Sequence, residues 1–303
     1  MHRLLAAVHG LTEEGADRSF EIVPITTSGD RIQDRALLDA GGKGLFTKEI
    51  EEALLRCDID CAVHSMKDME TALPEGLQIG AILERADVRD AWISPVAGRI
   101  TDLPQGARVG TSSLRRGAQV LAVRPDIEIV TFRGNVETRL EKISKGEADG
   151  TLLAAAGLER LGRLDAAAEV MPIDAMLPAV AQGAIGVEIR NGDEATLGMI
   201  SPINHEPSEA AVRAERAFLG VLDGSCRTPI AALAFLENSE MLTLMGKVLS
   251  PDGKNIYEIR RSGPLGAPKE LGKAAGVDLR RQAGEEFCRD VLGGGQSPSP
   301  KGD

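Results

Sequence analysis

A cysteine in a turn of small residues is the first group in this chain that could do chemistry. Cys226 stands in "LDGSCRTPIAAL" (222–233), after a glycine and a serine and before an apolar run. A cysteine that only filled a core would more naturally lie inside the apolar run. Its place in the turn leaves packing, pairing, metal binding and covalent attachment of another molecule open as interpretations.

A lysine and an aspartate follow an apolar run in "AVHSMKDM" (62–69), which we expect to be a strand and its carboxyl end. Lys67 and Asp68 could there act as a general acid or base, or stabilise a developing positive charge. The alternative is that Asp68 caps the next segment. We expect His64 to be hydrogen-bonded at the strand end, because no second histidine is spaced to share a metal ion with it.

Arginines gather at the expected strand ends in the middle of the chain. Arg115 and Arg116 follow the turn "GTSS", and Arg133 follows the run "IEIVTF". Ligands of open parallel sheets bind at these ends, where the N–H groups of helix N-termini also attract anions. The set predicts a cleft for a molecule with several carboxylates or phosphates, although any single arginine could be a solvated helix residue. Arg139 and Arg160 belong to the same region.

The glycine-rich stretch "GGKGLFTK" (41–48) has the look of a phosphate-binding loop. It lacks the Ser or Thr that should follow Lys43, and the upstream glycine of that motif is missing. We therefore reject a P-loop and keep the interpretation of a flexible loop that brings a cation near a cleft.

Composition restricts the class of protein. The formal net charge of −11 over 303 residues argues against general nucleic-acid affinity. No apolar run reaches the roughly 18 residues that span a membrane, and the opening "MHRLLAAVHGLTEE" is expected to be a helix rather than a secretory signal. The scattered cysteines predict neither a disulfide framework nor a metal site, and favour the reducing cytoplasm. These cysteines are Cys57, Cys61, Cys226 and Cys288.

Strand and helix patterns alternate over the first half of the chain, which predicts parallel sheets of the α/β class. Ser112 or Ser113 is the expected N-cap of the helix that carries Arg115. The expected strands are 20–25, 59–65, 77–84, 107–111, 127–132 and 149–157, and the expected helices are 46–55, 112–124 and 135–146.

Two segments, 84–91 and 177–187, have the character of crossings between two lobes. From about residue 206 the pattern changes to a helix, the Cys226 turn and two strand-like runs around "SPDGKN", which predicts a hairpin in a third, α+β unit. The glycine-, proline- and serine-rich tail from about residue 293 is expected to be disordered.

These motifs together resemble one enzyme family. "GGKGLFTKEIE", "AVHSMKDM", "GTSSLRR", "RGNVETRL", "LPAVAQGAIG" and "LDGSCRTPI" occur in the order and spacing of hydroxymethylbilane synthase, also called porphobilinogen deaminase. The resemblance implies stepwise condensation of four porphobilinogen molecules into linear hydroxymethylbilane with loss of ammonia, in tetrapyrrole biosynthesis. It also implies one covalent dipyrromethane cofactor per chain, joined to a cysteine by a thioether.

The resemblance assigns a role to each candidate residue. Cys226 matches the cofactor cysteine, and Asp68 matches the catalytic aspartate that assists departure of the amino group and stabilises positive charge. Asp30 and Gln182 match supporting positions. The residues expected to bind the carboxylates of cofactor and substrate are Arg115, Arg116, Arg133, Arg139, Arg160, Lys43, Lys67, Thr111, Ser112 and Ser113.

The family fold implies two periplasmic-binding-protein-like lobes joined by hinge strands and a small C-terminal domain. On this basis residues 1–86 with 184–203 form domain 1, 87–183 form domain 2, and 204–303 form domain 3. The resemblance further implies a monomer that hands its product to uroporphyrinogen-III synthase. Family members usually open with a strand that has no counterpart here, so we expect this chain to fold less securely and to be less active.

Two alternatives come from other classes of protein. A non-catalytic, two-lobed carboxylate-binding protein would explain the arginines and the crossings, but neither Cys226 nor Asp68. A cysteine hydrolase would pair Cys226 with His64 or His205, and would need an ester or amide substrate.

Overall fold

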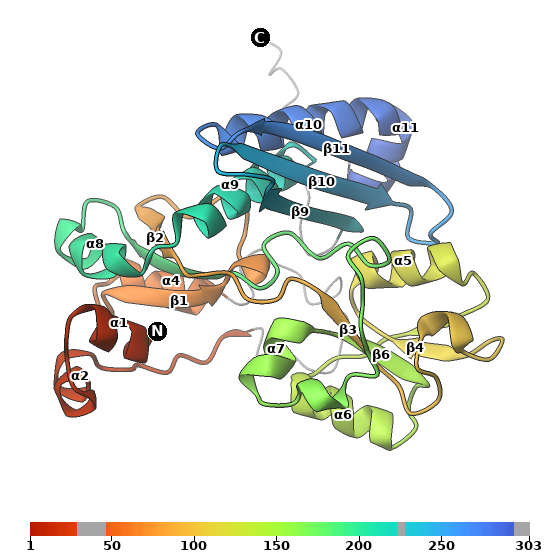
Figure 1. The fold of residues 1–303 in the computed structure, drawn as a ribbon, viewed down its shortest axis with the longest axis horizontal. Coiled ribbons are helices and arrows are strands. Elements are labelled where there is room, and N and C mark those ends of the chain that lie inside the picture. The colour runs from red at the N-terminus through yellow and green to blue at the C-terminus, as the bar shows by residue number, and fades with distance from the viewer. Residues whose placement is uncertain (29–46, 223–227, 294–303) are drawn as a thin grey trace, which may run out of the picture.

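The structure is a computed structural model that describes residues 1–28, 47–222 and 228–293. Three separate sheets organise these residues, with strand orders β1-β8-β2, β5-β4-β6-β3-β7 and β11-β10-β9. Figure 1 shows the first sheet on the left, the second at lower right and the third above both. The expected α/β class, with two lobes and a separate α+β unit, is confirmed. The exact domain boundaries stay a prediction.

The first lobe is built on β1 (Cys61–Ser65), β2 (Leu77–Ile82) and β8 (Ile185–Arg190). Helix α4 (Lys48–Leu55) buries Leu54 against Ala62 and Leu77, as the apolar spacing predicts. The other helices of this lobe that lie wholly within the described residues are α1 (His2–Val8), α2 (Glu13–Ser19) and α8 (Glu194–Ile200).

Two predictions for this lobe are wrong. The hydrogen-bonded neighbours among the described strands are antiparallel: β8 pairs antiparallel with both β1 and β2, because the chain returning from the second lobe enters the sheet between them. Residues 20–25, expected as a strand, carry no strand assignment and run as a loop in Figure 1. Ile22 in this loop is 74% exposed, so its apolar pattern does not mark a buried strand here.

The second lobe has a parallel centre, as predicted: β4 (Arg108–Gly110) pairs parallel with β5 (Glu128–Val130) and with β6 (Gly150–Ala154). An antiparallel addition completes the sheet, because β3 (Asp90–Ile93) pairs antiparallel with β6 and with β7 (Glu169–Val170). The helices are α5 (Leu114–Val123), α6 (Val136–Ser144) and α7 (Ala155–Arg160).

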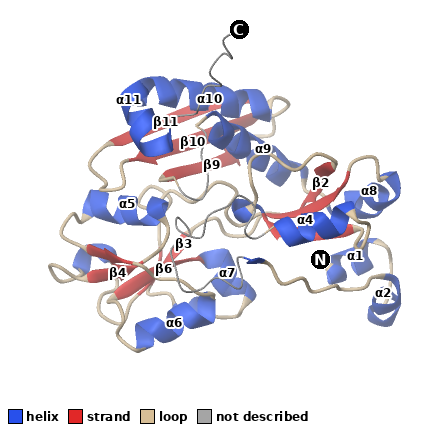
Figure 2. Ribbon diagram, turned by 180° about the vertical axis from the view of Figure 1, so that it is seen from behind, coloured by secondary structure: helices blue, strands red, loops and turns tan. Residues whose placement is uncertain are grey.

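The third unit is a meander of β9 (Ile230–Leu236), β10 (Met241–Leu249) and β11 (Ile256–Pro264), and its β10–β11 hairpin matches the prediction. Two long helices, α9 (Glu206–Val221) and α10 (Pro268–Ala283), cover one face of this sheet, and α11 (Glu285–Phe287) follows. Figure 2 shows α10 and α11 on the side of the sheet away from the lobes. Within the described ranges, every helix is too short or too polar to cross a membrane.

Candidate functional site

A cleft between the two lobes is lined by four of the described candidate residues, two from each lobe. We call it the interlobe cleft, a cavity of about 510 Å³. Ser65, Lys67 and Asp68 line it from the first lobe, and Arg116 and Arg139 line it from the second. Carboxylate and cationic groups from two lobes therefore face one space, as the sequence predicts.

Lys67 and Asp68 reach the cleft because β1 ends at Ser65 and a single turn of 3₁₀ helix, Met66–Asp68, follows. Met66 fixes the turn: its side chain is buried and its N–H donates to the carbonyl of Ala184 at 3.0 Å. Asp68 is exposed to the cleft, whereas burial lowers the pKa of the Lys67 ammonium. Asp68 opposes this shift and the Arg116 guanidinium adds to it.

On the opposite wall, the Arg139 guanidinium lies close enough to those of Arg116 and Arg133 for their charges to affect its pKa. Burial lowers the pKa of Arg139 to about 10, and the positive charges of Arg116 and Arg133 add to the shift. Arg139 Nε donates to the carbonyl oxygen of Gly134 at 2.9 Å, which aims the group along the cleft side of α6. Cations held together against their mutual repulsion are suited to a ligand with several negative charges.

Arg116 is positioned by Asp90, a residue that sequence reasoning did not single out. Asp90 is fully buried at the start of β3, and its Oδ1 accepts from Arg116 Nη2 at 2.6 Å and from Gln182 Nε2 at 3.1 Å. Its Oδ2 accepts from Arg115 Nη1 at 2.7 Å. In the sequence Asp90 is only an acidic residue at the end of the first crossing. Its role follows from the fold, which brings Arg115 and Arg116 beside it.

The turn before α5 has the geometry expected of a helix start. Ser113 is the N-cap, and its side chain accepts from the Arg116 N–H. Thr111 Oγ1 accepts from the Ser113 N–H at 3.1 Å, and Ser112 Oγ donates to the Phe132 carbonyl at 3.0 Å. The turn is therefore locally satisfied and sits beside the start of the helix that carries Arg116.

Other predicted residues lie outside the cleft lining. Arg115 is buried against Asp90 and the Leu177 carbonyl, and Gln182 is buried at the second crossing. Arg160 is exposed at the end of α7. For these three residues a contact with ligand stays a prediction. Three further candidates, Cys226, Lys43 and Asp30, lie outside the described residues.

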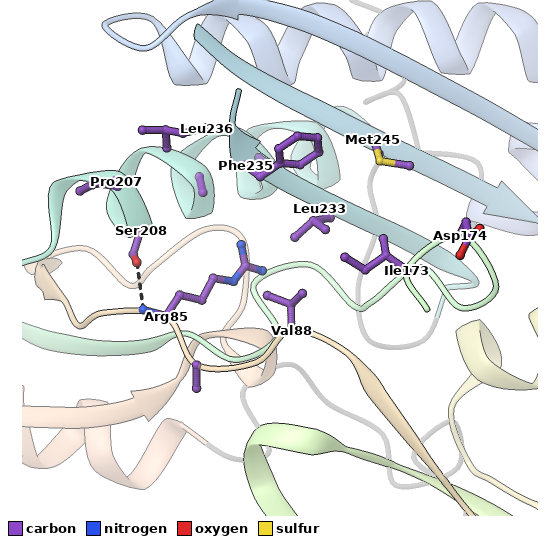
Figure 3. A pocket seen from close by; sticks show the side chains of 13 residues that line it. Arg85, Val88, Ile173, Asp174, Pro207, Ser208, Leu233, Phe235, Leu236 and Met245 are labelled. Carbon is purple, nitrogen blue, oxygen red and sulfur yellow. Dashed lines mark hydrogen bonds between the residues drawn. The ribbon is translucent and has the colours of Figure 1, made fainter. Parts of the chain in front are cut away.

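A second cavity lies beside the hinge, and Figure 3 shows its lining. It measures about 630 Å³ and is lined mainly by apolar side chains, among them Val88, Leu233 and Phe235. The Arg85 N–H donates to Ser208 Oγ at its edge, and the Arg85 guanidinium is already paired with Glu215. This cavity lacks a free cationic wall among the described residues, so the interlobe cleft is the better candidate site.

The chain is similar to porphobilinogen deaminases along most of its length. The family profile described as "Porphobilinogen deaminase, dipyromethane cofactor binding domain" matches residues 3–198, and "Porphobilinogen deaminase, C-terminal domain" matches residues 210–281. The chain is 51% identical over 290 residues to "Porphobilinogen deaminase" of Nitrobacter winogradskyi, covering 93% of this chain and 91% of that one. It is 50% identical over 287 residues to "Porphobilinogen deaminase, chloroplastic" of Oryza sativa subsp. japonica, covering 94% of this chain and 79% of that one.

One solved structure that matches part of this chain is the substrate binding protein of an amino acid ABC transporter. It shares 12% identity and a TM-score of 0.35, over 66% of this chain and 76% of that one. The assignment rests instead on the sequence relatives and on the two family profiles, which together cover both lobes and the third unit. The chain belongs to the porphobilinogen deaminase family.

Proposed function

We propose that the interlobe cleft is where this chain joins porphobilinogen units head to tail, with loss of ammonia, into linear hydroxymethylbilane. One observation carries the proposal: Asp68 and Lys67 face Arg116 and Arg139 across a single cavity. Porphobilinogen bears carboxylates on a pyrrole ring that becomes positively charged as its amine leaves. The cleft offers a carboxylate to the ring and guanidinium groups to the side chains.

The described residues suit the anionic dipyrromethane of this family, since burial and the positive charges of Arg116 and Arg133 lower the pKa of Arg139, and a bound anion would offset that charge. When bound, the dipyrromethane supplies the pyrrole end to which substrate is added. We assign its covalent attachment to Cys226. The groups that would bind its carboxylates and those of the substrate are Arg116, Arg133, Arg139 and Lys67, with Arg115, Arg160, Thr111, Ser112, Ser113 and Lys43 as further candidates.

Asp68 is the proposed catalytic residue. Its carboxylate is exposed to the cleft, where it can accept a hydrogen bond from a pyrrole N–H and offset positive charge on the ring. Lys67 beside it has a lowered pKa, so its ammonium gives up a proton more readily than an exposed lysine does. Asp68 can thus hold the ring, and Lys67 can give its proton to the departing amine.

The test is Asp68→Asn, with the exposed Asp165→Asn in the second lobe as the matched control. We expect Asp68→Asn to retain the covalent cofactor mass while turnover falls by about 100-fold or more, in the range seen when one group that stabilises transition-state charge is lost. Asp165→Asn should behave like the wild type. Turnover close to wild type in a cofactor-loaded Asp68→Asn chain would overturn the role of Asp68.

We further propose that the chain acts as a cytoplasmic monomer that passes its product to uroporphyrinogen-III synthase, without nucleic-acid or membrane partners. The support is the acidic net charge of −11 and the absence of a predicted disulfide framework. The two-lobed binding protein is not favoured, because neither the family nor Asp68 fits it. The hydrolase is not favoured either, because the chain belongs to the porphobilinogen deaminase family.

A further inference from the structure

A buried histidine and glutamate join the strand that carries Asp68 to the strand returning from the second lobe. In the β1–β8 pairing His64 stands opposite Gly186, and Glu188 stands opposite Ala62, so both side chains point to the same face of the sheet. His64 Nε2 lies 3.0 Å from Glu188 Oε2, with side-chain exposures of 4% and 0%. The pair therefore lies away from water, one short turn before Asp68.

Other charged groups face this pair from each neighbouring element. Glu51 of α4 has its pKa raised, first by burial and then by the charge of Glu188, while His64 opposes the shift. Arg216 of α9 has its pKa lowered by burial, and Glu188 and Glu70 oppose that shift. The cluster thus comprises three carboxylates, one histidine and one arginine, contributed by both strands, α4, α9 and the loop after Asp68.

This cluster is an expensive way to fill an interior. A carboxylate and an imidazole taken out of water lose hydration that the bond between them barely replaces, and an apolar pair of similar volume is often as stable or more stable. The cost is higher here because Glu188 Oε1 has no hydrogen-bond partner among the described residues. Because the buried pair costs stability, we expect it to contribute to function instead.

The cluster holds both ends of the segment that carries Lys67 and Asp68. Before the segment, His64 is tied to Glu188, and Gly186 leaves the space that Met66 fills: a Cβ there would lie 2.1 Å from the Met66 sulfur. After the segment, Arg216 donates to the carbonyls of Met69, Glu70 and Thr71 at 3.4, 2.5 and 3.2 Å. Asp68 is thereby fixed relative to β8 and to α9.

We propose that His64 and Glu188 are positioning residues: their buried bond sets the direction of the Met66–Asp68 turn and so the place of the Asp68 carboxylate in the cleft. This inference rests on the proposed role of Asp68. A misplacement of about 1 Å in a reacting group can cost about 100-fold in rate, whereas Arg116, Arg133 and Arg139, three of the four groups proposed to bind the carboxylates, belong to the other lobe. Weakening the pair should therefore lower kcat and leave KM nearly unchanged.

The test uses the cofactor-loaded chain and three variants. Glu188→Gln keeps an acceptor oxygen for His64 but removes the charge. The double variant His64→Leu/Glu188→Met replaces the pair by apolar side chains. Thr243→Val is the control for a purely structural polar group, since Thr243 is buried in β10 and bonded to Glu237 and Ser262. Each chain is measured for cofactor mass, Tm, kcat and KM.

We expect the double variant to keep the cofactor mass and a Tm equal to or above that of the wild type, while kcat falls about 10- to 100-fold and KM stays within about twofold. Glu188→Gln should show a smaller loss of kcat, again with KM nearly unchanged. Thr243→Val should show a lower Tm with kcat unchanged. The proposal is overturned if kcat stays at the wild-type value in Glu188→Gln and the double variant, or falls only in proportion to lost folded protein.

Should the double variant not fold, Glu188→Gln alone decides between these outcomes. The Asp68→Asn chain distinguishes a failure of the positioning role from a failure of the proposed function. If Asp68→Asn is inactive and the Glu188 and His64 variants are fully active, the positioning role fails and the proposed function stands. If Asp68→Asn turns over normally, the proposed function fails first.

Discussion

Arg116 donates to Asp90 Oδ1 through both Nη2, at 2.6 Å, and Nε, at 3.1 Å. This pair joins the first turn of α5 to the strand that enters the second lobe from the hinge. Burial alone raises the pKa of Asp90, but Arg115 and Arg116 outweigh it and hold the pKa well below the usual range of an aspartate. The place of Arg116 in the cationic wall of the cleft therefore depends on one buried carboxylate.

Asp90→Asn should lower the free energy of unfolding by about 3–5 kcal/mol at pH 7, the usual cost of removing one partner from a buried ion pair. Because the folded-state pKa of Asp90 is depressed, its contribution is present above the unfolded pKa and is lost only as pH falls through the folded value. Urea unfolding at pH 7 measures the change, with the exposed Asp165→Asn as control. Equal midpoints for both variants would contradict the account.

Arg139→Gln should stabilise the chain without cofactor while weakening anion binding. The folded pKa of about 10 lies below the usual value of an arginine, so burying the charge costs stability at every pH below about 10, and the cost fades only as pH rises from there towards that usual value. Citrate, a compact tricarboxylate, should raise the Tm of the wild type more than that of Arg139→Gln. Arg99→Gln, an exposed residue of the second lobe outside the cleft lining, is the control and should respond to citrate like the wild type. Identical citrate shifts in all three chains would argue against the cationic wall.

Glu215 ties the third unit to both crossings. Its buried carboxylate accepts from Arg85 Nη1 and Nη2 at 2.6 and 3.0 Å, from the Ala181 N–H at 2.6 Å and from the Ala234 N–H at 2.7 Å. Glu215→Ala should cost about 3–5 kcal/mol of unfolding free energy, since it leaves a buried guanidinium unpaired. The exposed Glu240→Ala should cost less than about 0.5 kcal/mol. Denaturant titration followed by circular dichroism compares them, and a small loss for Glu215→Ala would show that the junction is not needed for folding.

Glu51→Gln should change the pH dependence of stability. The folded-state pKa of Glu51 is raised above its ordinary 4.5, chiefly by burial, so the folded chain binds more protons than the unfolded chain between these two values. Stability contributed by the protonated form is present below pH 4.5 and is lost as pH rises through the folded pKa. Glu51→Gln cannot ionise and therefore does not lose this stability. Its Tm should match that of the wild type near pH 4 and equal or exceed it at pH 7. Glu52→Gln, the exposed neighbour on α4, should leave the pH profile unchanged, and a wild-type profile in Glu51→Gln would contradict the assignment.

Local features of the site could be predicted from the sequence because they depend on neighbours in the chain. The Ser113 cap and the start of α5 at Leu114 follow from residue types over a few positions. The turn that carries Asp68 follows from an apolar run that ends in polar residues. The convergence of Arg116 and Arg139 with Asp68 on one cleft also follows, since strand ends of a lobed α/β fold meet there.

Long-range pairings could not be predicted in this way. Asp90 lies 25 residues before Arg115, and His64 lies 124 residues before Glu188, so neither pair leaves a local pattern. The antiparallel insertion of β8 between β1 and β2 depends on the return path of the chain rather than on its own sequence. Residues 20–25 show the converse: their sequence is strand-like, but the structure assigns no strand there.

The covalent attachment of dipyrromethane to Cys226 is tested most directly by the intact mass of the purified wild type, measured beside that of Cys226→Ser. The account predicts that the wild type carries the added mass of one dipyrromethane and that Cys226→Ser carries none. Added mass on both chains would place the attachment at another residue and contradict the assignment of Cys226. A folded wild type that stays at its unmodified mass after incubation with porphobilinogen would contradict the proposed function itself.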